Sequence, residues 1–213
     1  RADAMPLIGR TMIERMRERG WQPYAVGGLT MGADPVAYAI ASASADDAIL
    51  QIAVILQVWN SAPTHSWSTY VRPSRWLSRD LGPHHVHGIS RGHLVFASTP
   101  AKAMQKFADL TAGRIVVAHN AEFDTSFLRT AAAQQNIDLH WQGVVCTLKL
   151  SRKLDPQRQQ THKLATLCER YGIDLIHAHD ALHDATATAQ LLPHLLRGNG
   201  VSNTEGIQPF LLP

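Results

Sequence analysis

The spacing of apolar residues along the first part of the chain predicts a helix, a strand and a second helix. Residues 4–19 carry apolar side chains at helical spacing, and a short apolar strand is expected at 24–27. Asp34-Pro35 then opens the second predicted helix, because Asp is a favoured N-cap and Pro suits the first helical position.

The pattern changes after this segment. Residues 48–58 form a long run rich in β-branched and apolar side chains, and 66–71 alternate between polar and apolar residues after the turn signal N-S-A-P-T. Two such runs joined by a turn predict a pair of antiparallel strands.

Short strands and longer helices alternate through the rest of the chain. We expect strands at 114–118 and 144–146, and helices at 100–111, 121–135, 147–153, 163–171 and 180–197. Strands followed by strand–helix alternation indicate an α/β protein with a mixed sheet flanked by helices. The last residues, 197–213, are rich in Gly, Asn and Ser and predict a flexible tail, although Q-P-F-L-L within them faintly resembles a sliding-clamp-binding peptide.

Composition narrows the class of protein only modestly. The chain has 213 residues, 45% of them hydrophobic, which suits one main domain without disordered or fibrous bias. Its formal charge of +3 arises from 20 basic and 17 acidic residues, an excess that is compatible with nucleic-acid binding but does not identify it. Cys146 and Cys168 lie far apart without a C-x-x-C pair, so we expect buried free thiols rather than a disulfide or zinc site.

No targeting or membrane segment is recognisable in the sequence. The longest apolar runs fall short of the ~20 residues needed to span a bilayer, and the start, R-A-D-A-M-P-L-I-G-R, lacks the apolar core of a secretory signal. These features predict a cytoplasmic protein without a membrane partner.

The first candidate for chemistry is Asp124, in the stretch I-V-V-A-H-N-A-E-F-D-T-S-F-L. A buried strand leads to a polar turn, and the next helix carries Asp124 in its first turn. Such a carboxylate can bind a divalent cation, or it can simply favour the positive end of the helix dipole. Glu122 points about 200° away from Asp124 around the helix, so both cannot face one metal ion.

The second candidate is the sequence H-D-A-L-H-D-A, in which His179 precedes Asp184 at the start of the last predicted helix. A histidine in this place can deprotonate an attacking water, while the aspartate holds a metal ion that polarises it. A lone histidine near a helix start is more often a cap or a surface group, but here both candidates occur in one chain.

Taken in order, these motifs resemble the DEDDh family of 3′→5′ exonucleases, which includes the proofreading epsilon subunit of bacterial DNA polymerase III. The resemblance runs from about Asp47 to Leu196. It implies a ribonuclease-H-like fold, with a mixed five-stranded sheet flanked by helices. It also implies two Mg²⁺ or Mn²⁺ ions, a single-stranded DNA or RNA 3′ end as substrate, and association with a DNA polymerase. The family roles fall on His179 as general base, on Asp124 and Asp184 as metal ligands, and on His119, Asn120, Phe123 and His87 as nucleic-acid contacts.

The chain departs from the family at its first motif. The family has an Asp and a Glu on its first strand, whereas alignment of A-V-G-G-L-T-M-G-A-D-P places Gly27 and Leu29 at these positions. With two of four carboxylates missing, we expect one weakly held cation or none, and impaired activity. We also expect Tyr24 to Gly28 to enter the centre of the sheet.

The N-terminal block has a different resemblance. Residues 1–45 are similar to an internal segment of orotate phosphoribosyltransferases, but the diphosphate-binding signature of that family is missing. We therefore divide the chain into this fragment, an exonuclease-like domain at 46–196 and the tail. The expected function is 3′→5′ exonuclease chemistry. The alternatives are a catalytically inactive nucleic-acid-binding or polymerase-associated module, and a transferase accessory protein.

Overall fold

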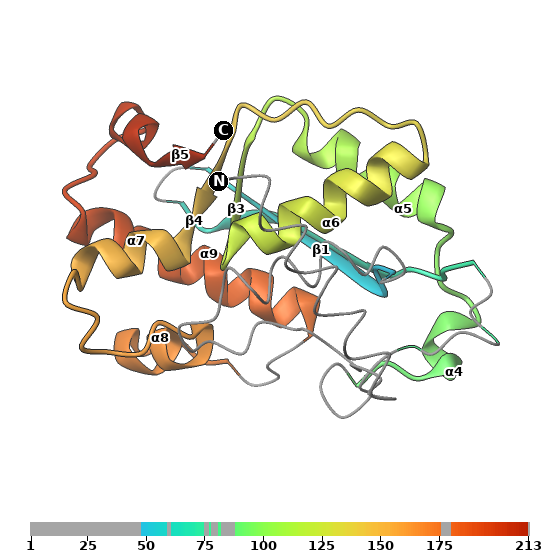
Figure 1. Cartoon of the computed structure of the whole chain (residues 1–213), viewed down its shortest axis with the longest axis horizontal. Helices are drawn as coiled ribbons and strands as arrows, with labels where there is room; N and C mark the ends of the chain where they lie inside the picture. The colour runs from blue at the N-terminus through green and yellow to red at the C-terminus, as the bar shows by residue number, and fades with distance from the viewer. Residues whose placement is uncertain are drawn as a thin grey trace, which may run out of the picture.

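The structure is a computed structural model that describes residues 48–58, 61–74, 77, 81, 88–175 and 180–212. Its first elements are strand β1 (Gln51–Gln57) and strand β2 (Pro63–Tyr70), which pair antiparallel (Figure 1). Gln51 lies opposite Tyr70, and the register shifts between Leu56 and Gln57. This pair confirms the prediction made from the two apolar runs.

A second sheet lies farther along the chain. Strand β3 (Ile115–Ala118) runs parallel to β4 (Gly143–Cys146), and β4 pairs antiparallel with β5 (Leu211–Leu212). The mixed sheet is therefore confirmed, although the described strands are divided between two sheets. The segment 24–28, expected at the sheet centre, lies outside the described residues.

The helices follow the predicted pattern closely. They are α4 (Arg91–Leu94), α5 (Pro100–Thr111), α6 (Ala121–Gln134), α7 (Thr147–Leu154), α8 (Leu164–Tyr171) and α9 (Ala181–Gly198). All except α4 were predicted from sequence. Among the described residues, no helix has the length and apolar character needed to cross a bilayer.

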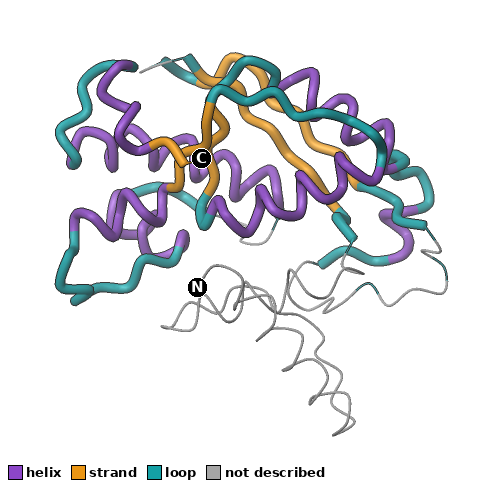
Figure 2. Tube along the Cα trace, turned by 45° about the horizontal axis from the view of Figure 1, so that its top comes forward, coloured by secondary structure: helices purple, strands orange, loops and turns teal. Residues whose placement is uncertain are grey.

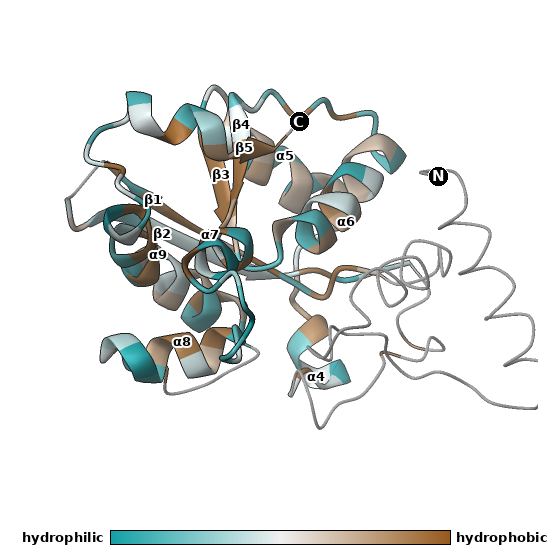
Figure 3. Cartoon of the chain, turned by 60° about the vertical axis from the view of Figure 1, so that its left-hand side comes forward, coloured by the Kyte–Doolittle hydropathy of each residue, from teal (hydrophilic) through white to brown (hydrophobic). Residues whose placement is uncertain are grey.

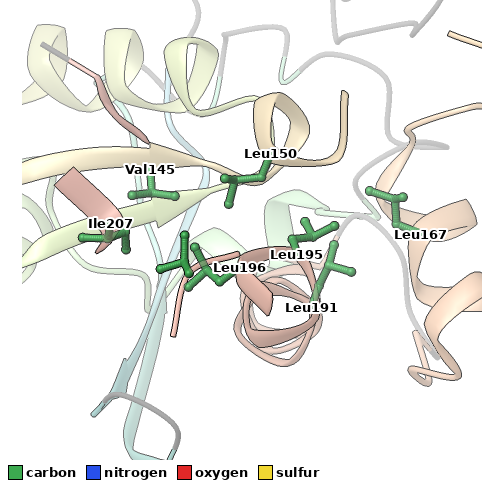
Figure 4. Close-up of a cluster of buried hydrophobic side chains, with 8 residues drawn as sticks. Val145, Leu150, Leu167, Leu191, Leu195, Leu196 and Ile207 are labelled. Carbon is green, nitrogen blue, oxygen red and sulfur yellow. The ribbon is translucent and has the colours of Figure 1, made fainter. Parts of the chain in front are cut away.

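Strand β4 shows how helices cover both faces of the second sheet. Val145 belongs to a core cluster with residues of α7, α8 and α9 (Figure 4), whereas its neighbours Val144 and Cys146 pack with Ala121 of α6. Successive side chains of a strand point to opposite faces, so β4 is covered on both sides. Figure 2 shows helices on either side of the strands, and β3 and β5 carry the hydrophobic colour of Figure 3.

The first sheet has its own core. Ile52 and Val54 of β1 pack against α5, where Met104 and Phe107 are buried, and against Ala132 of α6. Helix α9 also packs on β1 and on β3. Since the same helix touches strands of both sheets, it joins the two parts of the described fold.

The C-terminal segment differs from the expected flexible tail. After α9 the chain forms a 3₁₀ helix, η1 (Glu205–Phe210), and then β5 pairs with β4. Ile207 is buried in the cluster that contains Val145 and Leu195. Pairing and burial therefore hold 201–212 on the domain, and Phe210, Leu211 and Leu212 of Q-P-F-L-L take part in that docking.

Ile207→Ala is expected to lower the free energy of unfolding by about 2 kcal/mol, because it leaves a cavity in a packed cluster. Urea denaturation would measure this loss. Gln208→Ala is a matched control, since Gln208 is the exposed next residue of η1 and should change stability by less than about 0.5 kcal/mol. Equal behaviour of the two variants would mean that the tail is not docked in solution.

Candidate active site

Asp124 lies in the first turn of α6, directly after β3. Asn120 makes the turn between them with a left-handed backbone, at φ 64°, a conformation that asparagine tolerates better than most residues. Ala121 is fully buried, and its N–H donates to Cys146 Sγ at 3.4 Å. This contact ties the start of α6 to the end of β4 and fixes the place from which Asp124 projects.

Asp184 occupies the corresponding place in α9, in its first turn. The helix is capped by Asp180, whose Oδ1 accepts from the N–H groups of Leu182 at 3.0 Å and His183 at 3.1 Å. An aspartate at this position satisfies backbone donors that have no partner within the helix. The cap therefore defines the turn that carries Asp184.

The two carboxylates interact, although they come from distant parts of the sequence. Burial raises the pKa of Asp124 to about 7, its own backbone N–H opposes the shift, and the charge of Asp184 raises the pKa further. Two neighbouring carboxylates in a partly buried place are unfavourable when both are ionised. A divalent cation between them would remove this penalty, so their surroundings suit a metal ion.

The remaining ligands of a two-metal site are not found among the described residues. No group of three Asp, Glu, His or Cys side chains in the described part of the chain is arranged to hold a metal ion. Glu122 forms an exposed ion pair with Lys149 at 2.7 Å, in line with the expectation that it cannot share a metal with Asp124. Among the described residues, Asp124 and Asp184 therefore offer a cation two carboxylate ligands at most.

His119, predicted to contact nucleic acid, turns its ring into the protein. Its Nδ1 lies 3.0 Å from the Oγ1 of Thr147, a fully buried residue whose hydroxyl can donate to the Ala118 carbonyl at 3.3 Å. Its Nε2 is buried and has no partner of regular hydrogen-bond geometry. Burial lowers the pKa of His119 to about 4, which the backbone of His162 partly opposes. The ring is therefore neutral and supports the turn that leads to Asn120.

Two other predicted contacts lie at the same turn. Asn120 and Phe123 are half-buried, and the Phe123 ring packs on Phe127 with centroids 4.9 Å apart. The Trp141 ring, in contrast, donates from Nε1 to Thr111 Oγ1 at 3.0 Å and packs against the first core cluster. Phe123 is thus the better placed aromatic beside Asp124.

Several predicted residues lie outside the described residues. These are the general base His179, the contact residue His87, and Gly27 and Leu29 at the first-motif positions. The structure therefore brings together Asp124 and Asp184, with His119, Asn120 and Phe123 near the first of them.

Two residues near the site were missed from sequence. Gln51 of β1 donates to Asp180 Oδ2 at 2.9 Å and accepts from the Ala181 N–H at 3.2 Å. The signal for Gln51 was a single amide within the apolar run I-L-Q-I-A-V-I. Asp180 had the signature of an N-cap at the start of a periodic helix. Both cysteines, in contrast, are free and buried as predicted.

Comparison with known proteins identifies the family of this chain. The sequence profile of the exonuclease family matches residues 30–192. The chain is 31% identical over 151 residues to a DNA polymerase III PolC-type of Caldanaerobacter subterraneus, covering 71% of this chain and 10% of that protein. It is 32% identical over 152 residues to a PolC-type enzyme of Latilactobacillus sakei, covering 68% and 10%, and 32% identical over 129 residues to that of Streptococcus thermophilus, covering 59% and 9%.

The chain spans about a tenth of the length of these relatives. The profile match covers most of the chain and includes both Asp124 and Asp184, which lie in the motif order expected of DEDDh exonucleases. The predicted ribonuclease-H-like α/β class agrees with the observed mixed sheet and flanking helices. This chain therefore belongs to the exonuclease family, as a DEDDh domain of the 3′→5′ exonuclease class.

Proposed function

We propose that this chain acts on the 3′ end of a single-stranded nucleic acid and hydrolyses its terminal phosphodiester bond, at a rate reduced by the loss of the first acidic motif. The observation that carries the proposal is the pairing of Asp124 and Asp184. These residues lie in the first turns of two separate helices and interact through their charges. Such a pairing is costly without a cation, and it is unnecessary for helix formation.

The roles of the residues follow from their chemistry. Asp124 and Asp184 would hold Mg²⁺ or Mn²⁺, which supplies charge stabilisation to the reacting phosphate. His179 would take the proton from the attacking water. Asn120 and Phe123 would contact the terminal nucleotide, with His119 supporting their turn from inside the protein. His87 would contribute a further contact.

The relatives' name, DNA polymerase III, favours DNA as substrate and a polymerase as partner. A cytoplasmic location belongs to the same proposal. The domain division at residues 46 and 196 also stays a proposal, and the family match begins earlier, at residue 30.

A second candidate function is an inactive module that binds nucleic acid or a polymerase. It is supported by the alignment of Gly27 and Leu29 with the missing acids, and by the absence of a third metal ligand among the described residues. Both candidates keep the same fold and differ in turnover.

Degradation of a 5′-labelled single strand with Mn²⁺ separates the two candidates. We expect weak 3′→5′ laddering that Asp124→Ala, Asp184→Ala and His179→Ala each reduce by at least about 100-fold. Gly27→Asp combined with Leu29→Glu should raise the rate by a similar factor, because it restores the carboxylates that the family places there. An RNA strand of the same sequence tests the substrate preference.

The outcomes are distinct. Laddering that survives all three alanine variants would come from a contaminating nuclease and would count against the proposal. Strand binding without laddering, even in the variant with restored acids, would favour the inactive module.

A further inference from the structure

Gln51 makes a two-bond contact that joins distant parts of the chain. Its Nε2 donates to Asp180 Oδ2 at 2.9 Å, and its Oε1 accepts from the Ala181 N–H at 3.2 Å. The side-chain amide is used as donor and as acceptor at once. A carboxylate could not donate to Asp180, and an apolar side chain could form neither bond.

The strand that carries Gln51 is a firm support. The flanking residue Ile52 is buried against α5, and Gln51 itself lies opposite Tyr70 in the pair with β2. Because neighbouring side chains alternate in direction, Gln51 points away from the face that Ile52 packs on. Its hydrogen bonds show that it points toward the start of α9.

At the other end of the contact, both oxygens of Asp180 have defined partners. Oδ2 faces Gln51, while Oδ1 accepts from two backbone N–H groups of α9 and lies 2.9 Å from His183 Nδ1. One oxygen therefore bonds to β1, and the other caps α9. The bond to Gln51 fixes the rotation of the carboxylate, and this rotation aligns the cap with the first turn.

The same turn leads directly to the candidate active site. The Asp180 carbonyl accepts from the Asp184 N–H at 2.9 Å, and Asp180 follows His179 in the chain. A shift of the helix start would therefore move Asp184. Partners behind a metal ligand commonly change metal affinity by 10–100-fold when they are removed.

We propose that Gln51 is a positioning residue, which locks the start of α9 to β1 and thereby sets the place of Asp184 relative to Asp124. The inference rests on the proposed function for its metal-binding consequence. The pair of hydrogen bonds from Gln51 to Asp180 and Ala181, called the lock below, is itself a property of the fold.

Gln51→Leu removes both hydrogen bonds at similar volume and adds no charge. The lock predicts that amide hydrogen exchange at Leu182, His183 and Asp184 becomes about 10-fold faster in this variant. It also predicts that the dissociation constant for Mn²⁺, measured by electron paramagnetic resonance, rises by about 10-fold. Gln57→Leu is the control, because Gln57 lies on the same strand but bonds to the Ser61 carbonyl at an exposed place.

A charge-conserving exchange gives a sharper test. In Gln51→Glu with Asp180→Asn, the asparagine amide can donate to the glutamate, and the Ala181 N–H still has an acceptor. The lock predicts that the double variant recovers exchange rates and Mn²⁺ affinity to within about 3-fold of wild type, whereas Gln51→Glu alone keeps fast exchange.

The results separate the lock from the proposed function. Unchanged exchange in Gln51→Leu, or fast exchange in the double variant, would overturn the lock whatever happens to Mn²⁺. If the wild-type chain binds no Mn²⁺, the metal-dependent function fails, while the exchange rates alone still decide for or against the lock.

Discussion

Asp124→Asn is expected to stabilise the chain at pH 8 by up to about 4 kcal/mol, as measured by urea denaturation without divalent cations. Burial is the main cause, because it raises the pKa of Asp124 from 3.8 to about 7. At pH 8 the folded chain must hold an ionised carboxylate that is far easier to hydrate in the unfolded chain. Asparagine removes this charge at nearly the same size.

The pH dependence follows from the direction of the shift. Between about pH 4 and 7 the folded chain binds a proton at Asp124 that the unfolded chain releases. The contribution of this group to stability is therefore present in full below pH 4 and is lost as the pH rises through 7. The advantage of Asp124→Asn should disappear at low pH.

Mn²⁺ and a control variant complete the experiment. The cation favours the ionised carboxylate, so it should stabilise the wild-type chain at pH 8 and leave Asp124→Asn unchanged. Asp138→Asn makes the same chemical change at an exposed position and should alter stability by less than about 0.5 kcal/mol. A destabilised Asp124→Asn at pH 8 would mean that the carboxylate has a favourable partner in the apo chain.

The helices were predictable where local signals and packing agree. Residues 100–111 form α5 with the expected bounds, since Thr99 accepts from the Lys102 N–H and Pro100 occupies the first turn. Helix α6 was predicted equally well, because the polar turn at Asn120 follows the apolar strand β3. In both cases the residues that start the helix are adjacent to it in sequence.

The C-terminal segment was not predictable in this way. Its Gly, Asn and Ser residues favour an irregular chain, but Ile207 and Leu211 pack in a cluster to which α9 contributes the most residues and β4 contributes Val145. Strand β5 has only two residues, too few for an alternating pattern to be recognised. Tertiary contacts decide the structure of this segment.

In the candidate site, too, the features marked by the local sequence could be predicted, whereas those set by contacts between distant residues could not. Asp124 and Asp184 could be selected from the motif order, because each lies at a helix start that the local sequence marks. The inward orientation of His119 depends on Thr147, 28 residues away, and the contact of Gln51 depends on Asp180, 129 residues away. Such partners follow from the way the strands and helices assemble, which residue types alone do not specify.

The second large effect on stability is expected at His119, which changes the free energy of unfolding with pH in the opposite direction to Asp124. Burial lowers the pKa of His119 from 6.5 to about 4. Between these values the unfolded chain binds a proton that the folded chain does not, so stability falls as the pH is lowered. The size of this loss is about 3 kcal/mol between pH 6.5 and 4. In the wild-type chain it is masked, because Asp124 contributes a change of opposite sign over nearly the same range.

Replacing Asp124 should therefore make the contribution of His119 to the pH dependence of stability measurable. We expect the free energy of unfolding of Asp124→Asn to rise by about 3 kcal/mol from pH 4 to 6.5, whereas that of the wild-type chain stays nearly level. In the double variant Asp124→Asn with His119→Asn this rise should disappear. Asparagine at 119 keeps a nitrogen near the position of Nδ1, so the contact with Thr147 can persist. His140→Asn, at an exposed position, should leave the profile of Asp124→Asn unchanged. If the single and double variants instead share one pH profile, the His119 ring must be protonated in the folded chain, and its inward contact with Thr147 would have to open as the pH falls.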